Sequence, residues 1–260
     1  MRFLQRITVI LFLLVTLLFV GTKVYIARTV DRTPPVFTCE NDVISVPVGT
    51  PQQQLLQGLT AADDRDGDLS DQIMIKGVTK LITADTARVT YVVFDSSSNM
   101  ATYQRTLQYT NYEKPKLTLK QPLVFPIGSR ISVLELLTAH DVVDGDVSNK
   151  IRVSSQNVNT SSQGIYSITV QVTNSLGDTE SIPLSLTISN LAHDTLPVTL
   201  SDYIVYLDKG TPFQPASFVL TPAAVGDVVI DSDVNPDTPG IYEVSYTYQN
   251  HTAHQTVIVR

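Results

Sequence analysis

The chain contains a sequence repeat with three copies, at intervals of about 80 residues. The clearest pair of copies is 60–73 and 138–151, which are identical at eight of fourteen positions, including Asp, Asp, Gly and Asp at matching offsets. A repeat of this length indicates one small folded module that is copied along the chain. We therefore expect three modules, over residues 31–110, 111–190 and 191–260, the last of which is divergent.

Each copy closes with runs of alternating apolar and polar residues that are rich in β-branched side chains, for example 88–95, 164–174 and 240–250. Such runs, with Gly, Asn, Asp or Ser at their breaks, predict antiparallel sandwiches or barrels. Each module then needs two sheets to bury its apolar faces. Cys39 is the only cysteine, so no disulfide within the chain joins those sheets. Short helical turns are expected at 53–59 and 132–138.

The N-terminal segment is apolar. Ile7–Thr22 carries no charge, twelve of its first fourteen residues are strongly apolar, and Val24–Ala27 continues the run. About 20 apolar residues span a bilayer. We expect an uncleaved transmembrane signal anchor at 7–27, with residues 1–6 in the cytoplasm and the repeats outside. A cleaved signal peptide and a buried helix of a soluble protein are the alternatives, although no convincing small-residue cleavage site follows the run.

The composition and the motifs exclude some classes of function. The net charge is −7 and the pI is about 5.0, and there is no basic stripe, so nucleic acid is not an expected partner. The sequence has no H-E-x-x-H motif, no G-x-S-x-G motif and no phosphate-binding loop. We therefore expect no enzyme, no catalytic residues and no required cofactor.

The first two copies each contain an acidic loop. Hard cations such as Ca²⁺ bind carboxylate oxygens, and alternate Asp residues across a glycine turn can direct several carboxylates to one point. The alternative is ordinary turn chemistry, in which Asp accepts hydrogen bonds from nearby backbone amides. The third copy keeps only Asp227. The candidate calcium ligands are Asp63, Asp64, Asp66, Asp68, Asp141, Asp144 and Asp146.

Several motifs together resemble a known family. They are Asp31-x-Thr33-Pro34-Pro35-Val36, Ala61-x-Asp63-x-x-Asp66-Gly67-Asp68, Val89-Thr90-Tyr91-x-Val93-x-Asp95-x-x-x-Asn99, and Arg105. This combination resembles the bacterial immunoglobulin-like repeat of surface proteins, a type also appended to insecticidal crystal proteins. The resemblance covers 31–110 well, 111–190 moderately, and 191–260 only through Thr238–Tyr242 and Tyr246–Asn250.

The resemblance implies Ig-like β-sandwiches, exposure outside the cell, and a spacer or adhesive role. The expected architecture is therefore all-β, with three tandem Ig-like β-sandwich domains after one N-terminal transmembrane helix. The expected function is that of a single-pass membrane protein that serves as a structural spacer or surface-presentation module. The alternative is an adhesin-type module that binds a surface glycan or protein through its distal third domain.

Overall fold

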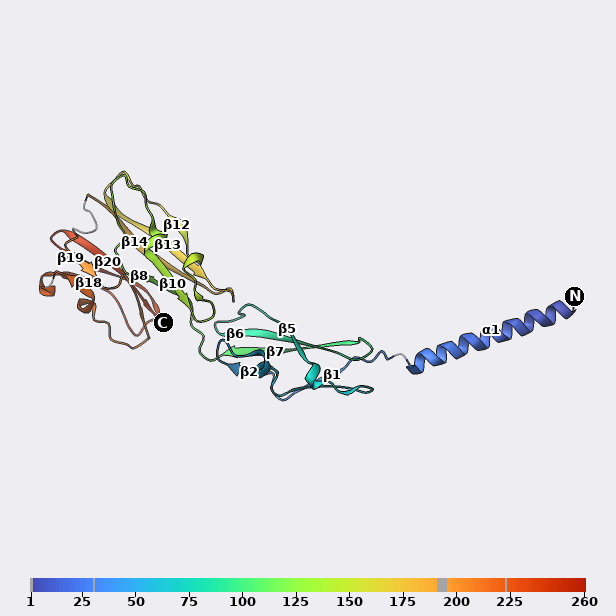
Figure 1. Cartoon of the computed structure of the whole chain (residues 1–260). Helices are drawn as coiled ribbons and strands as arrows, with labels where there is room; N and C mark the ends of the chain where they lie inside the picture. The colour runs from blue at the N-terminus through green and yellow to red at the C-terminus, as the bar shows by residue number, and fades with distance from the viewer. Residues whose placement is uncertain (1, 30, 191–195, 223) are drawn as a thin grey trace. The chain divides into compact units, whose positions relative to one another are not determined.

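The computed structural model describes residues 2–29, 31–190, 196–222 and 224–260 (Figure 1). One helix, α1 (Arg2–Thr29), is followed by strands that form several sheets. The chain divides into two compact units, Met1–Thr110 and Asn111–Arg260. The expected class, all-β Ig-like sandwiches after one apolar helix, is confirmed. The domain bounds expected from the repeat stay a prediction.

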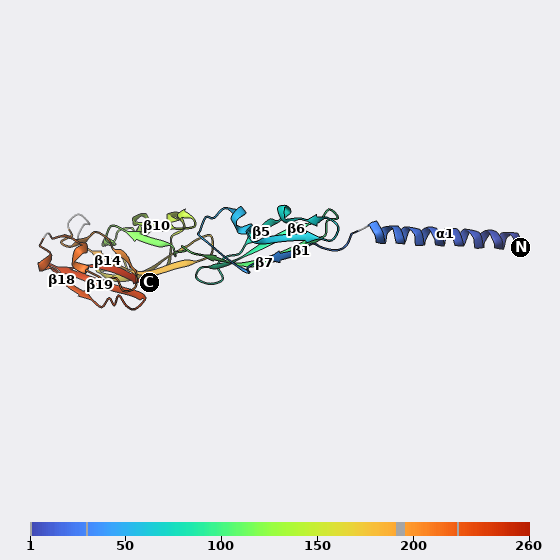
Figure 2. The same ribbon diagram turned by 90° about the horizontal axis from the view of Figure 1, so that it is seen from below.

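The first sandwich has two sheets with the strand orders β1-β3-β4 and β2-β7-β6-β5. In the second sheet, β5, β6 and β7 lie side by side in both ribbon views (Figures 1 and 2). The strands are β1 (Val36–Cys39), β2 (Val43–Val46), β3 (Leu59–Asp63), β4 (Gly67–Asp68), β5 (Met74–Val78), β6 (Thr86–Phe94) and β7 (Met100–Tyr109).

The second sandwich repeats this plan with the strand orders β11-β10-β8 and β12-β13-β14-β9, and the third has β15-β17 and β16-β20-β19-β18. The strands of the second are β8 (Lys116–Leu119), β9 (Val124–Pro126), β10 (Leu137–Asp141), β11 (Gly145–Asp146), β12 (Arg152–Gln156), β13 (Gly164–Thr173) and β14 (Thr179–Ser189). Those of the third are β15 (Thr199–Leu200), β16 (Ile204–Leu207), β17 (Val219–Thr221), β18 (Val229–Ser232), β19 (Gly240–Tyr248) and β20 (His251–Val259).

The three sandwiches share their strand pairing. In each, a long antiparallel hairpin closes the module (β6–β7, β13–β14 and β19–β20), and an early strand pairs in parallel with the last one (β2–β7, β9–β14 and β16–β20). The alternation in the sequence places one face of each strand inside. On β6, for example, Ala87, Val89, Tyr91 and Val93 are all fully buried, whereas Arg88 between them is exposed. The repeated pattern thus determines a repeated core.

Short 3-10 helices connect the sheets. Two of them, η1 (Gln52–Leu56) and η3 (Val133–Leu136), lie where the sequence predicts helical turns. Leu55 and Val133 fix these turns to the cores, since each side chain is buried. The others within the described residues are η2 (Ser70–Gln72), η4 (Ser148–Lys150), η6 (Pro215–Phe218) and η7 (Val225–Asp227).

The second and third sandwiches form one packed body. Their buried apolar residues make a continuous cluster that runs from Leu117 to Ile258. The Tyr203 amide donates to Leu119 O (2.9 Å), and the Leu117 amide donates to the Tyr206 hydroxyl (2.9 Å). Lys120 pairs with Asp202. The boundary expected between these modules, at residues 190 and 191, adjoins residues 191–195, which lie outside the described residues, and these contacts join the modules on both sides of it.

Candidate functional site

Each Asp-Gly loop is built on a turn that its first aspartate holds. Asp63 Oδ1 accepts hydrogen bonds from the Arg65 amide (2.9 Å) and the Asp66 amide (3.1 Å). Asp141 Oδ1 accepts the equivalent bonds from Val143 (2.9 Å) and Asp144 (3.0 Å). Side-chain oxygens of Asp mimic a backbone turn in this way. The turn needs a residue with positive φ, and glycine fills that position in both loops, Gly67 with φ 74° and Gly145 with φ 71°.

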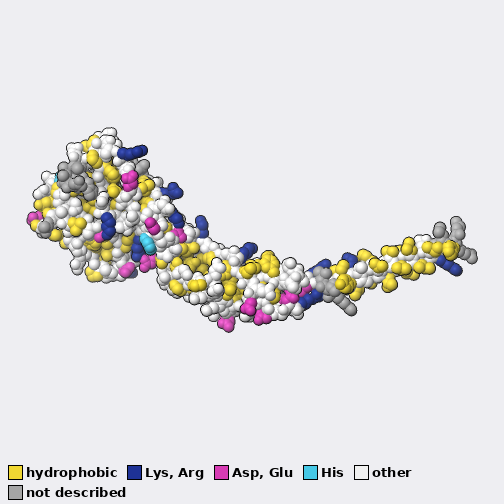
Figure 3. Space-filling model, in the orientation of Figure 1, with side chains coloured by type: hydrophobic (Ala, Val, Ile, Leu, Met, Phe, Trp, Pro, Cys, Tyr) yellow, Lys and Arg dark blue, Asp and Glu magenta, His cyan; other side chains and the backbone are white. Residues whose placement is uncertain are grey.

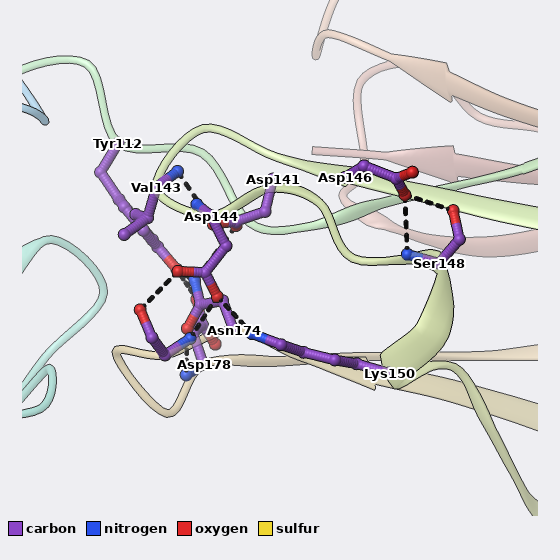
Figure 4. A network of polar contacts seen from close by, with 10 residues as sticks. Tyr112, Asp141, Val143, Asp144, Asp146, Ser148, Lys150, Asn174 and Asp178 are labelled. Carbon is purple, nitrogen blue, oxygen red and sulfur yellow. Dashed lines mark hydrogen bonds and ion pairs between the residues drawn. The ribbon is translucent and has the colours of Figure 1, made fainter.

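The second aspartate that both loops share forms hydrogen bonds to the turn of the long hairpin. Asp66 accepts bonds from the Ser96 amide (2.7 Å) and hydroxyl (2.9 Å). Asp144 accepts the same pair from Ser175 (2.7 and 2.6 Å) and also pairs with Lys150 Nζ at 2.6 Å (Figure 4). The Lys150 and Ser175 donors hold the pKa of Asp144 below its ordinary value. Both aspartates therefore have a structural partner set.

The remaining loop acids lie at the surface. Asp68 and Asp146 are exposed, and each accepts bonds from the amide and the hydroxyl of the serine two residues later, Ser70 or Ser148 (Figure 4). These bonds lower the pKa values of both carboxyls. Asp64 is exposed as well. The structure thus uses most of the predicted ligands as local acceptors, and their calcium binding stays a prediction.

A different acidic group comes together in the first sandwich. Asp31, Asp63 and Asp95 each offer a carboxylate oxygen, and these three oxygens lie within 4.8 Å of one another. The three side chains are buried, with exposed fractions of 5, 8 and 7%. They come from the segment before β1, the end of β3 and the residue after β6. Among the described residues no other group of three His, Cys, Asp or Glu side chains meets in this way.

Among the described residues, one fully buried oxygen of this group has no hydrogen-bond donor. Asp95 Oδ1 accepts bonds from the amides of Ser97 (2.9 Å) and Asn99 (2.7 Å), and its Oδ2 accepts from Asn99 Nδ2 (2.7 Å). Asp31 Oδ1 accepts from the Thr33 amide (2.9 Å), a bond that lowers the pKa of this carboxyl. Asp63 Oδ2, in contrast, is buried and has no hydrogen-bond donor among the described residues.

The second sandwich has an amide in place of one of these carboxylates. Asn174, at the end of its long strand β13, stands where the first sandwich has Asp95. Its Nδ2 donates to Asp141 Oδ2 (3.1 Å) and approaches the Tyr112 hydroxyl at 2.9 Å, and that hydroxyl donates to Asp178 Oδ2 (2.8 Å). Burial, followed by the bond to Asp178, raises the pKa of Tyr112. The oxygen equivalent to the one left over in the first sandwich therefore has a donor here.

Of these three residues, only Asp63 is among the calcium ligands that the sequence predicts; Asp31 and Asp95 are not. The two acids lie 32 residues before and after Asp63, so no local spacing connects them. They do belong to the motifs that carry the resemblance, Asp31-x-Thr33 and Asp95-x-x-x-Asn99. That signal was present in the sequence but pointed to a family and not to a site.

A hollow of about 200 Å³ lies between the second and third sandwiches. Its walls include Leu184, Tyr203 and His251, and Leu196 of its lining directly follows the undescribed residues 191–195. Pockets for small ligands usually have volumes of about 300–1,000 Å³. The hollow is smaller than that range, so its volume does not indicate a ligand site.

Part of the second sandwich matches a known protein family. The sequence of residues 116–183 matches the family described as bacterial surface protein, Ig-like domain. The expected resemblance is confirmed. Domains of this family are typically not catalytic. The matched range lies within the second sandwich; the first sandwich has the same strand pairing, and the third has it except for one strand of the smaller sheet.

One curated relative is the pesticidal crystal protein Cry22Aa of Bacillus thuringiensis, which is 35% identical over 124 residues. The match covers 42% of this chain and 16% of that protein. The chain thus spans about a sixth of the length of this relative, and the match does not extend to its whole activity.

Among solved structures, a carbohydrate-binding module, CBM51-2 in complex with GlcNAc, and INT domains of Clostridium perfringens ZmpB align with 56% of this chain and 26% of their own, at 18% identity and a TM-score of 0.24. A lipoprotein of Bacteroides thetaiotaomicron, BT2262, aligns with 85% of this chain and 98% of its own, at 11% identity and a TM-score of 0.22. TM-scores this low carry no conclusion about function.

Proposed function

We propose that the chain is a membrane-anchored, non-enzymatic surface protein whose Ig-like sandwiches act outside the cell as a spacer or a presentation module. The observation that carries the proposal is the helix α1. Its segment Gln5–Ile26 has a mean hydropathy of 2.4, and none of it is buried against the rest of the chain. By length and composition it is able to cross a membrane.

The surface of α1 is suited to a lipid environment. Hydrophobic side chains cover most of the helix (Figure 3), and Phe12, Leu17 and Leu18 have exposed fractions of 69, 74 and 64%. Twelve strongly apolar residues at the centre of a bilayer favour insertion by about 4–7 kcal/mol in total. The hydroxyls of Thr16 and Thr22 donate to Phe12 O and Phe19 O, both at 2.8 Å. These polar groups therefore need no water.

The spacer role is supported by the packing of the second unit. Two sandwiches that share a core do not bend at their joint without exposing apolar surface, so 111–260 would extend as one stiff body. Binding of a surface glycan or protein by the third domain is the alternative; it has no structural observation of its own and stays a prediction.

Membrane fractionation tests the anchor. The full chain, produced in a bacterial host, is expected in the membrane pellet after an alkaline carbonate wash, and external protease is expected to digest the sandwiches in intact spheroplasts. The double variant Leu13→Arg/Leu17→Arg should move the chain to the soluble fraction, because each arginine costs about 2.5–3.5 kcal/mol at the centre of a spanning helix.

The matched control is Val36→Arg, which adds a charge at an apolar residue that is 67% exposed outside the helix. This variant should remain in the membrane. The anchor is wrong if the wild-type chain is recovered in soluble form, or if mass spectrometry of the mature protein shows that residues 1–26 have been removed.

A further inference from the structure

We propose that Asp31, Asp63 and Asp95 form a binding site for one divalent cation and that Ca²⁺ fits it best. The site differs from the loop sites suggested by the sequence, because two of its three ligands lie outside the Asp-Gly loop. It is also independent of the proposed membrane anchor.

The donor set favours calcium. Mg²⁺ usually keeps several waters and binds through one or two carboxylates, whereas Ca²⁺ takes 6–8 oxygen ligands, among them several carboxylates. Oxygen ligands lie 2.3–2.6 Å from Ca²⁺, so two oxygens on one ion are at most about 5 Å apart. The three carboxylate oxygens lie within 4.8 Å of one another. One Ca²⁺ could thus contact all three with little movement of the side chains, and water would complete its coordination.

The charges require a counter-ion. Three aspartates bring a formal charge of −3, and burial removes most of the water that would screen their repulsion. Arg65 forms an ion pair with this group: its Nε lies 3.8 Å from Asp31 Oδ2, and its side chain is 42% exposed. A guanidinium carries one positive charge, so it does not neutralise three carboxylates. A divalent cation would balance the remaining charge.

The buried oxygen that has no hydrogen-bond donor among the described residues, Asp63 Oδ2, also favours a cation at this site. Asp63 Oδ2 is buried without a donor, and a buried acceptor without a partner costs about 1–3 kcal/mol. In the second sandwich the equivalent Asp141 Oδ2 receives the amide of Asn174. The chain therefore contains both solutions at one position of the repeat: an amide donor where the neighbour is Asn, and, by our proposal, a cation where it is Asp.

Calorimetric titration of the full chain in detergent micelles tests the site. After treatment with chelator, CaCl₂ is expected to bind with a stoichiometry near one and a Kd of about 10⁻⁴–10⁻³ M, the range of extracellular calcium modules. Asp63→Asn keeps the Oδ1 acceptor of the turn but removes the charge, and it should weaken calcium binding at least tenfold. Asp95→Asn should do the same.

Two control variants make the result specific. Asp141→Asn alters the matching turn of the second sandwich, and Asp64→Asn removes an exposed acid of the first loop; both should bind calcium within twofold of wild type. Circular dichroism shows whether each variant folds. If Asp63→Asn or Asp95→Asn does not fold, Asp31→Asn tests the site at a residue that lies outside the strands. Equal melting temperatures with calcium and with chelator, or wild-type calcium affinity in Asp63→Asn and Asp31→Asn, would overturn the proposal.

Discussion

At the scale of single residues, the core of the first sandwich contains a buried cation, Arg105 on β7. It is 4% exposed, and its Nε and one terminal nitrogen donate to Asn41 O (2.9 Å) and Gln57 O (2.8 Å). The third sandwich has Gln255 at the matching register position: Arg105 pairs with Val89, and Gln255 pairs with Val244. Gln255 is fully buried and donates to Asp202 O (2.7 Å). In both sandwiches, a long side chain on the last strand thus donates hydrogen bonds to backbone carbonyls of segments that precede the hairpin.

Arg105→Ala should destabilise the first sandwich by about 3 kcal/mol, because two backbone carbonyls lose a charged donor and the core loses the buried side chain that carries it. Chemical denaturation of the full chain in detergent measures this change. Arg88→Ala removes an exposed arginine of the neighbouring strand and should change the free energy of unfolding by less than about 0.5 kcal/mol. Equal effects of the two variants would contradict the role given to Arg105.

At the scale of elements, the Asp-Gly loop and the hairpin turn act together. Asp144 lies in the loop, Ser175 in the turn after β13, and Lys150 in η4, and their contacts converge on one carboxylate. Because these contacts are made to the charged form, the folded pKa lies below the unfolded value of about 3.9. The stabilisation is therefore complete above the unfolded pKa and is lost as the pH falls through the folded pKa.

Asp144→Asn should lower the free energy of unfolding of the second unit by about 1 kcal/mol at pH 7, and the difference from wild type should shrink below about pH 4. Urea denaturation at pH 7, 4 and 2.5 measures both effects. Asp64→Asn, a change at an exposed acid, serves as the control and should leave stability nearly unchanged at every pH. A difference between wild type and Asp144→Asn that is as large at pH 2.5 as at pH 7 would refute the electrostatic origin.

The sequence was sufficient for the elements whose determinants are local. The alternation in 88–95 and 164–174 predicted buried strands, and Gly67 and Gly145 marked the turns. It was not sufficient for contacts between distant segments. Asp31 comes close to Asp63 because β1 pairs with β3, and Asp95 reaches them from the other sheet. Local sequence spacing encodes neither contact. The shared core of the second and third sandwiches could not be predicted either. The alternating pattern shows that a valine or leucine is buried, but it does not show whether the side chain packs against its own module or the next one.

At the scale of the whole molecule, the shared core predicts how the chain unfolds. Residues 111–260 should melt in one cooperative transition, because neither sandwich can open without exposing apolar surface of the other. Tyr206→Ala removes the hydroxyl that accepts the Leu117 amide and should lower this transition as a whole. Differential scanning calorimetry measures it, and two transitions within this unit, only one of which moves, would show that the sandwiches are independent.

The junction between α1 and the first sandwich has a mechanical consequence. Asp31 is five residues beyond Ile26, the last residue of the membrane-crossing segment. Five extended residues reach at most about 18 Å. With α1 in the lipid, the first sandwich has no stalk and must stay close to the headgroups. Calcium bound at Asp31 would fix the far end of this short linker to Asp63 and Asp95 of the first sandwich, so that the sandwich and the helix would be joined without a flexible segment beyond Asp31.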